Sequence, residues 1–425
     1  MRKRKTNIFA GIDWLLVLIY LVLVFFGWIN IYAATVTENT REIFDFTTLY
    51  GKQLQWIGLS FLLIFFIISI DSKFYERFSG VFYVISIISL IGLFVFGSTI
   101  NGATSWYNFG SFSLQPSEFA KAATILALAN FLNEPNFDLT KLKSQISTFV
   151  LILIPAILIV LQPDAGSALI YFSLVIVLYR EGLPAYYLVI GLVAIVLFTL
   201  TLYAGFTTSL LLIYGSLTLF FAYIINFRNI KLKRDWLKII GLYIITGLFM
   251  YSVDYVFNNV FEQRHRDRFS ILLGQTSDTK GIGYNTDQSM ITIGSGGLTG
   301  KGFLEGDRTQ GNFVPEQHTD YIFSTVGEEW GFLGSSAVII LFIALFIRLI
   351  HMAEKQKSTF SRVFGYSVAS ILFFHFLINI GMVIGLLPTI GIPLPFFSYG
   401  GSSLWGFTIL LFIFIRLDAD KTYEW

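Results

Sequence analysis

Twelve apolar runs of membrane-spanning length dominate this chain of 425 residues and constrain its fold more than any other feature. A transmembrane helix needs about 20 predominantly apolar residues, and a helix satisfies its own backbone hydrogen bonds in lipid. Most of the runs lack the alternation of a barrel strand. We therefore predict an all-α, polytopic transmembrane bundle of about 12 spans, formed by one integral membrane domain over residues 1–425. The runs cover 12–34, 53–70, 79–98, 115–133, 147–162, 165–180, 184–204, 207–226, 236–259, 321–350, 363–387 and 396–416.

The composition excludes several classes of protein. Hydrophobic residues make up 55% of the chain and charged residues only 13%, about half of the ~25% that soluble domains carry. A soluble enzyme, a disordered chain and a nucleic-acid binder are therefore excluded. The net charge of +2 is too small to indicate a polyanionic partner. The absence of cysteine excludes disulfides, thiolate metal sites and covalently attached haem.

The distribution of basic residues predicts the orientation in the membrane. A basic run, Met1–Lys5, precedes an apolar run that is too long for a signal peptide, so we interpret this region as an uncleaved anchor. If the N-terminus is cytoplasmic, most of the 29 Lys and Arg residues fall in cytoplasmic segments. The pattern predicts that both termini are cytoplasmic and that residues 260–320 form one long extracytoplasmic loop.

That loop is polar, rich in glycine and far longer than any other connection, which favours a functional role. Its glycine-rich stretch, 294–302, lacks the spacing of a phosphate-binding loop and favours tight backbone turns near a ligand. The basic cluster Arg264–Arg268, which includes Arg266, is consistent with anion contact and equally with a solvated loop edge.

Ionisable residues inside apolar runs are costly and point to function. Glu118 and Lys121 lie three residues apart in the run that begins near Pro116, so they share one helix face. Two interpretations remain open. The residues form either a structural ion pair between helices or the wall of a polar cavity that meets a charged substrate.

Asp164 lies between two apolar runs, directly after a proline. An ordinary role for aspartate at such a place is to cap the following helix. In the predicted topology, however, Asp164 and Glu118 both lie near the outer ends of their helices. The two carboxylates are therefore also candidates for the border of one cavity.

Asp320 is the last acidic residue before the chain re-enters the membrane after the long loop. A carboxylate in this half-desolvated position is suited to act as a general base, and His318 and Glu316 are close enough in sequence to tune it. The alternative is helix capping by Thr319 or Asp320. Glu328, together with the residue after it, lies at a depth where a carboxylate is not expected to face lipid.

The segment 393–403 interrupts an apolar hairpin with two prolines and two glycines. Broken backbone at membrane depth is tolerated only where it is buried in protein or lines a cavity. Transporters use the same device, so this segment alone does not distinguish an enzyme from a carrier.

Five ordered motifs together resemble the SEDS family (shape, elongation, division and sporulation), and most resemble its members that act in cell elongation and rod shape. The motifs are QPSEFAK, QPDAGSA, GSGGLTGKGFLEG, PEQHTDYIFSTVGEEWGF and GLLPTIGIPLPFFSYGGSS, within 115–167 and 294–403. The resemblance implies a peptidoglycan glycosyltransferase that polymerises lipid II on the outer face of the bacterial cytoplasmic membrane. Asp320 matches the family's essential acidic residue, and Glu118, Lys121 and Asp164 match residues of its central cavity. Our candidate substrate-binding and cavity residues are Gln115, Ser117, Glu118, Lys121, Asp164, Arg266, Lys301, Glu316, His318, Ser398 and Ser402.

The resemblance also implies a mechanism and partners. Asp320 would deprotonate the 4-hydroxyl of the acceptor's GlcNAc, and undecaprenyl pyrophosphate would leave the donor with inversion. Lys121, the Arg264–Arg268 patch or a divalent cation, Mg²⁺ or Mn²⁺, would neutralise the leaving pyrophosphate. A class B penicillin-binding transpeptidase and other membrane proteins of the elongation complex are the expected partners.

One departure from the family concerns the number of spans. The family usually has ten, whereas residues 184–259 hold enough apolar sequence for three helices where the family has one, which predicts an inserted helical pair. Three other functions remain open: a lipid II flippase, the septal polymerase of cell division, and a structural scaffold for a penicillin-binding protein.

Overall fold

The computed structural model describes residues 11–36, 42–100, 102–110, 112–228, 232–261, 263–275 and 282–421. The chain divides into two compact units, one made of Met1–Pro184 with Asn285–Trp425 and the other of Ala185–Tyr284. The basic run Met1–Lys5, on which part of the predicted orientation rests, lies outside the described residues.

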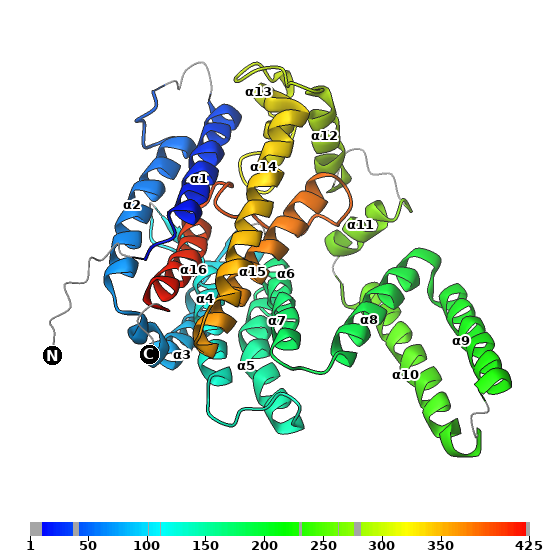
Figure 1. The fold of residues 1–425 in the computed structure, drawn as a ribbon. Coiled ribbons are helices and arrows are strands. Elements are labelled where there is room, and N and C mark those ends of the chain that lie inside the picture. The colour runs from blue at the N-terminus through cyan, green and yellow to red at the C-terminus, as the bar shows by residue number, and fades with distance from the viewer. Residues whose placement is uncertain are drawn as a thin grey trace, which may run out of the picture. The chain divides into compact units, whose positions relative to one another are not determined.

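The first unit is a bundle of long helices (Figure 1). Several begin where the sequence supplies a cap: Asp13 accepts a hydrogen bond from the amide of Leu16, and Thr48 and Asp71 cap the next two helices in the same way. Its long helices are α1 (Trp14–Thr35), α2 (Leu49–Ser69), α3 (Ser72–Phe96), α4 (Pro116–Leu132), α5 (Leu142–Val160), α14 (Ile322–Glu354), α15 (Thr359–Val383) and α16 (Gly401–Asp420). Its shorter elements are α6 (Ala165–Leu169), the 3₁₀ helix η1 (Ile170–Ser173), α7 (Leu174–Arg180), α12 (Ile282–Ser295), whose first turn belongs to the second unit, and α13 (Asp307–Gln310).

The second unit consists of α8 (Tyr186–Ala204), α9 (Phe206–Arg228), α10 (Leu232–Asn259) and α11 (Gln263–Leu272). α8, α9 and α10 pack against one another. The unit therefore contains the three helices that the sequence predicts within 184–259. Whether two of them are an insertion stays a prediction.

The predicted polytopic helical fold is confirmed. Within the described ranges, ten helices are long and apolar enough to cross a membrane. The two remaining predicted spans are helical but shorter: α4 has 17 residues, and the run 165–180 is divided into α6, η1 and α7. The long loop 260–320 is more structured than expected, because three helices, α11, α12 and α13, lie within it.

α4 and α16 form the buried centre of the first unit. α4 packs against α3, α5, α15 and α16, and most of its side chains are buried. The two helices approach closely at Gly406, where an added Cβ would lie 3.1 Å from the carbonyl oxygen of Glu118. Charged residues on α4 are therefore enclosed by protein and do not face lipid.

A small antiparallel sheet, which the sequence analysis did not predict, precedes α4. Its strands are β1 (Ser98–Ile100), β2 (Ala103–Asn108) and β3 (Ser113–Leu114), in the order β1-β2-β3. The strands carry threonine, tryptophan and tyrosine, residue types that favour strands. The sheet was missed because its strands are too short to show a clear alternating pattern.

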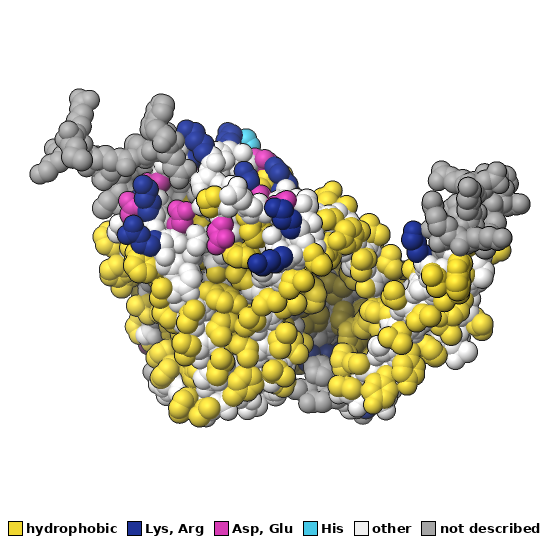
Figure 2. All heavy atoms as spheres, turned by 90° about the horizontal axis from the view of Figure 1, so that it is seen from below, with side chains coloured by type: hydrophobic (Ala, Val, Ile, Leu, Met, Phe, Trp, Pro, Cys, Tyr) yellow, Lys and Arg dark blue, Asp and Glu magenta, His cyan; other side chains and the backbone are white. Residues whose placement is uncertain are grey.

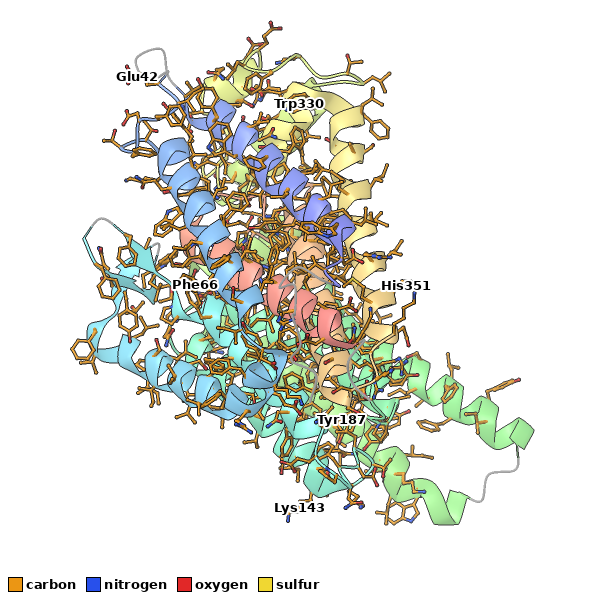
Figure 3. All side chains as sticks on the ribbon, turned by 60° about the vertical axis from the view of Figure 1, so that its left-hand side comes forward. Glu42, Phe66, Lys143, Tyr187, Trp330 and His351 are labelled. Atoms are coloured by element: carbon orange, nitrogen blue, oxygen red, sulfur yellow. The ribbon has the colours of Figure 1, made fainter. Side chains whose placement is uncertain are left out.

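Apolar side chains make up much of the molecular surface that the figures show. Figure 3 shows Glu42 and Trp330 at one end and Lys143 at the other. Figure 2 shows charged side chains gathered on part of the face seen from below, while hydrophobic side chains cover much of the rest. A surface that is largely apolar is typical of a protein that spans a bilayer.

α14 is kinked at Gly331, whose φ of 65° and ψ of −159° lie in a region that only glycine adopts readily. The kink allows the glycine-rich segment 297–302 to lie alongside residues 328–333, with backbone hydrogen bonds between them. An added Cβ at Gly300 would lie 2.1 Å from a backbone oxygen of the kinked segment. The glycines therefore serve close backbone packing.

We expect Gly331→Ala to destabilise the protein. The backbone conformation alone costs about 1–3 kcal/mol for a residue with a Cβ, and the new methyl group would lie 2.2 Å from the amide nitrogen of Gly300. The measurement is the thermal unfolding midpoint in detergent. Gly294→Ala is the matched control, because nothing lies within 4 Å of its added Cβ. Equal midpoints for the two variants would contradict this account of the kink.

Candidate functional site

The turn that carries Asp320 is fixed through its backbone. The carbonyl oxygens of three consecutive residues, 318–320, accept hydrogen bonds from the amide of Tyr399, the hydroxyl of Ser398 and the side-chain amide of Asn379, at 3.0, 2.7 and 2.8 Å. The donors belong to α15 and to the broken segment that the sequence analysis singled out. Two distant parts of the chain thus determine where this turn lies.

The carboxylate of Asp320 lies beside Gly391. A Cβ added to Gly391 would be 3.4 Å from Asp320 Oδ2, and the φ of Gly391 is 78°. Asp320 itself is half-buried. The N-cap of α14 is Tyr321, which makes no side-chain cap hydrogen bond. The prediction that Thr319 or Asp320 occupies this N-cap position is therefore wrong.

His318 and Glu316 flank the same turn. Burial lowers the pKa of His318, although the Glu316 carboxylate acts in the opposite direction, so the imidazole is neutral near pH 7. Glu316 is exposed, and its carboxylate accepts a hydrogen bond of 3.1 Å from the Thr319 hydroxyl. Both residues therefore belong to the surroundings of Asp320.

Asp164 caps a helix, which is the first of the two roles that the sequence left open, while its place at the border of a cavity stays a prediction. Its Oδ1 accepts a hydrogen bond of 3.0 Å from the amide of Ser167 and so caps α6. Its Oδ2 accepts a hydrogen bond of 3.0 Å from the side-chain amide of Gln115. α6 also packs close to the segment beside Asp320, because a Cβ on Gly166 would lie 3.1 Å from the carbonyl oxygen of Ile390.

Ser402 and Ser398 hold backbone segments together. Ser402 Oγ accepts from the amide of Gln115 and donates to the carbonyl of Ser113, at 3.1 and 3.2 Å. Ser398 Oγ, which donates to the turn of Asp320, also accepts from the amide of Leu394 at 2.9 Å. Both side chains therefore position other groups of the site.

Glu118 and Lys121 form a buried ion pair on α4. The Lys121 ammonium lies 2.9 Å from the Glu118 carboxylate, and the two residues are only 1% and 2% exposed. The ammonium also lies 2.9 Å from Nε2 of His375 on α15. Ser117, the neighbour of Glu118, is fully buried. The sequence analysis missed His375 and Asn379, although the rule that polar residues inside a span point to function would have found both.

Lys301 pairs with acidic neighbours. Its ammonium lies 2.8 Å from the buried carboxylate of Glu328 and 3.1 Å from the exposed carboxylate of Asp307. The hydrogen bond to Glu328 raises the pKa of Lys301. Glu328 also accepts hydrogen bonds from the amides of Arg308 and Thr309 at the start of α13. As expected, Glu328 does not face lipid, and together with Lys301 it fastens the loop to α14.

Arg266 lies on α11 in the other compact unit, where it donates to the carbonyl of Asn258 at 3.0 Å. The side chain of Arg264, the first residue of the same predicted patch, lies outside the described residues. In the part of the chain that the structure describes, no group of three or more His, Asp or Glu side chains is arranged to hold a metal ion. The candidate Mg²⁺ or Mn²⁺ thus lacks a fitting protein site there.

The structure therefore gathers Gln115, Asp164 and Ser402 into one connected group and Glu118, Lys121 and His375 into another. α15 contributes to the second group through His375 and to the turn of Asp320 through Asn379. The site is made of buried and half-buried polar groups next to a broken membrane segment, with one carboxylate on a turn that the backbone fixes.

Comparison with known proteins gives a consistent result. The model of the FtsW/RodA/SpoVE family, described as cell cycle proteins, matches residues 13–229 and 207–423. The chain is 32% identical over 443 residues to the peptidoglycan glycosyltransferase RodA of Treponema pallidum, covering 97% of this chain and 98% of that one. It is 32% identical over 354 residues to the peptidoglycan glycosyltransferase MrdB of Escherichia coli, covering 83% and 81%.

Solved structures have the same fold. A chain from a study of the structural coordination of polymerization and crosslinking by a peptidoglycan synthase complex matches with a TM-score of 0.69 and 25% identity, covering 97% of this chain and 99% of that one. The rod shape determining protein RodA of Thermus thermophilus matches with a TM-score of 0.63 and 24% identity, covering 97% and 98%. The chain belongs to the FtsW/RodA/SpoVE family of polytopic membrane proteins.

Proposed function

We propose that this protein is a peptidoglycan glycosyltransferase that polymerises lipid II into glycan strands for cell elongation. Relatives with this activity in their names match nearly the full length of the chain. The geometric observation that carries the proposal is the turn of Asp320, where a half-buried carboxylate lies on a backbone that three hydrogen bonds hold in place.

In the proposed reaction, Asp320 accepts the proton of the 4-hydroxyl of the acceptor's GlcNAc. The resulting oxygen attacks the anomeric carbon of the donor's MurNAc from the face opposite the leaving group. The new glycosidic bond forms as the bond to undecaprenyl pyrophosphate breaks, so the configuration inverts. A base of this kind must lie within hydrogen-bond reach of the hydroxyl, which requires a fixed turn.

The remaining site residues have supporting roles in this proposal. Gln115 and Asp164 form a polar edge close to the segment beside Asp320, where we place the sugar head group. Lys121 is our candidate cation for the leaving pyrophosphate. Lys301, another candidate substrate-binding residue, pairs with Glu328 and Asp307 and helps to hold the loop in this proposal.

We further propose that both termini are cytoplasmic and that a class B penicillin-binding transpeptidase is the partner. The start of α1 and the end of α16 lie together, since a Cβ added to Gly11 would be 2.9 Å from the carbonyl oxygen of Ala419. One solved chain to which this chain is similar comes from a study of a peptidoglycan synthase complex that coordinates polymerization and crosslinking. Two of the helices α8, α9 and α10 are, in this proposal, an insertion into the family's usual ten spans.

The test uses the full chain with its transpeptidase partner and labelled lipid II. The expected product is long glycan strands, separated on a gel and sensitive to a muramidase. A flippase would instead move labelled lipid II across a vesicle membrane and make no strands. Translocation without strands would therefore overturn the proposal in favour of the transporter, and binding of lipid II with neither product would favour a scaffold.

A further inference from the structure

α15 presents two polar side chains to the site from one helix face. His375 and Asn379 are four residues apart, so they lie one above the other. They are 1% and 0% exposed, in a helix that is otherwise long and apolar enough to cross a membrane. Polar groups at such a depth are expensive unless they are hydrogen-bonded. Each of these two side chains contacts a different part of the site.

Asn379 fastens the turn of Asp320 to the broken membrane segment. Its side-chain amide donates one hydrogen bond to the carbonyl of Asp320, at 2.8 Å, and another to the carbonyl of Ile392, at 2.7 Å. An amide NH₂ group has two donors, so both are used. Ile392 follows Gly391, beside which the Asp320 carboxylate lies. Asn379 thus links the backbone of Asp320 to the segment beside which the Asp320 carboxylate lies.

His375 orients the buried ion pair. Its Nε2 lies 2.9 Å from the Lys121 ammonium, which can only donate hydrogen bonds. Nε2 is therefore the acceptor, and the neutral imidazole carries its proton on Nδ1. Together with Glu118, His375 gives the ammonium two acceptors in fixed directions.

We propose that His375 and Asn379 are positioning residues that hold Lys121 and Asp320 in one fixed geometry through α15. The inference rests on the proposed polymerase function. It adds two residues that affect the reaction through the groups that they position, Lys121 and Asp320. A misplacement of about 1 Å in a catalytic group costs about 100-fold in rate. Because α15 contacts both Lys121 and the turn of Asp320, it keeps these two groups from shifting relative to each other.

The test compares leucine and glutamine at each position in the full chain with its partner. Leucine removes the hydrogen bonds at similar volume, while glutamine restores an amide donor at 379 and an acceptor at 375. We expect Asn379→Leu to lower kcat for strand synthesis by about 10- to 100-fold with less than about a threefold change in KM, and Asn379→Gln to recover part of the loss. We expect His375→Leu to lower kcat by a similar factor, also with little change in KM, and His375→Gln to recover part of that loss.

Ser367→Ala is the matched control. Ser367 is buried on the same helix, but its hydroxyl bonds only to the carbonyl of Val363 within that helix. The control should keep the wild-type kcat. Leucine variants that lower the unfolding temperature but keep kcat, or that raise only KM, would overturn the positioning role. If the leucine variants do not fold, the glutamine variants are compared with alanine variants at the same two positions. Glutamine variants that are no more active than the alanine variants would overturn the positioning role.

A structure of the Asn379→Leu protein separates this inference from the proposed function. Loss of both hydrogen bonds should displace the Asp320 turn from Gly391 by an amount visible at the backbone. An unchanged turn would overturn the positioning role even if the wild type makes strands. Conversely, a displaced turn in the variant, together with a wild type that makes no strands, would support the positioning of Asp320 and reject the polymerase function.

Discussion

Asp320→Ala is expected to reduce lipid II polymerisation by about 10²- to 10⁴-fold, the contribution of a positioned general base. The substitution removes the only group of the site that we assign to proton transfer, while the turn keeps its hydrogen bonds, because these are made by the backbone carbonyls of 318–320. Folding and lipid II binding should therefore change little. The measurement is the initial rate of strand synthesis together with binding of labelled lipid II.

Glu305→Ala is a matched control for Asp320→Ala, because it removes an exposed carboxylate from the same long loop, 260–320. We expect this variant to retain the wild-type rate. Asp320→Asn should be as inactive as the alanine variant, since the amide keeps the shape but cannot accept the proton. Long strands from Asp320→Ala or Asp320→Asn would reject Asp320 as the base and leave the family assignment intact.

The helical fold was predictable because each span is a local property of the sequence. An apolar run of sufficient length must form a helix in lipid, and the twelve predicted runs all fall on helices. The contact between Glu118 and Lys121 was predictable for the same reason, since their spacing of three residues places them on one face. The sheet before α4 was missed because very short strands carry little pattern.

Contacts between distant segments could not be predicted from a single sequence. The amide of Gln115 meets Ser402 across 287 positions, and Lys121 meets His375 across 254. No local pattern encodes such pairings, which depend on how the helices pack. For the same reason, the hydrogen bond between Asp164 and Gln115 could not be predicted, because Gln115 lies far away in the sequence, at the start of α4.

Lys121→Leu is expected to destabilise the protein by about 3–5 kcal/mol, because it leaves the Glu118 carboxylate buried without its cation. The prediction decides between the two interpretations of this pair. If the pair only joins helices, the double variant Glu118→Leu Lys121→Leu should recover both stability and activity, since replacing a buried pair with apolar residues is often neutral. If the pair belongs to the catalytic cavity, the double variant should recover stability and remain inactive, which is the result that we expect.

Unfolding midpoints and strand synthesis, measured on the same preparations, separate these outcomes. Lys141→Ala is the control, because Lys141 and Asp138 form an exposed pair, 67% and 41% accessible, on the same spacing of three residues. Such a pair contributes less than about 1 kcal/mol, so this variant should match the wild type in both measurements. An active, stable double variant would remove Glu118 and Lys121 from the catalytic machinery. The proposed chemistry would then rest on Asp320 and on the polar edge formed by Gln115 and Asp164.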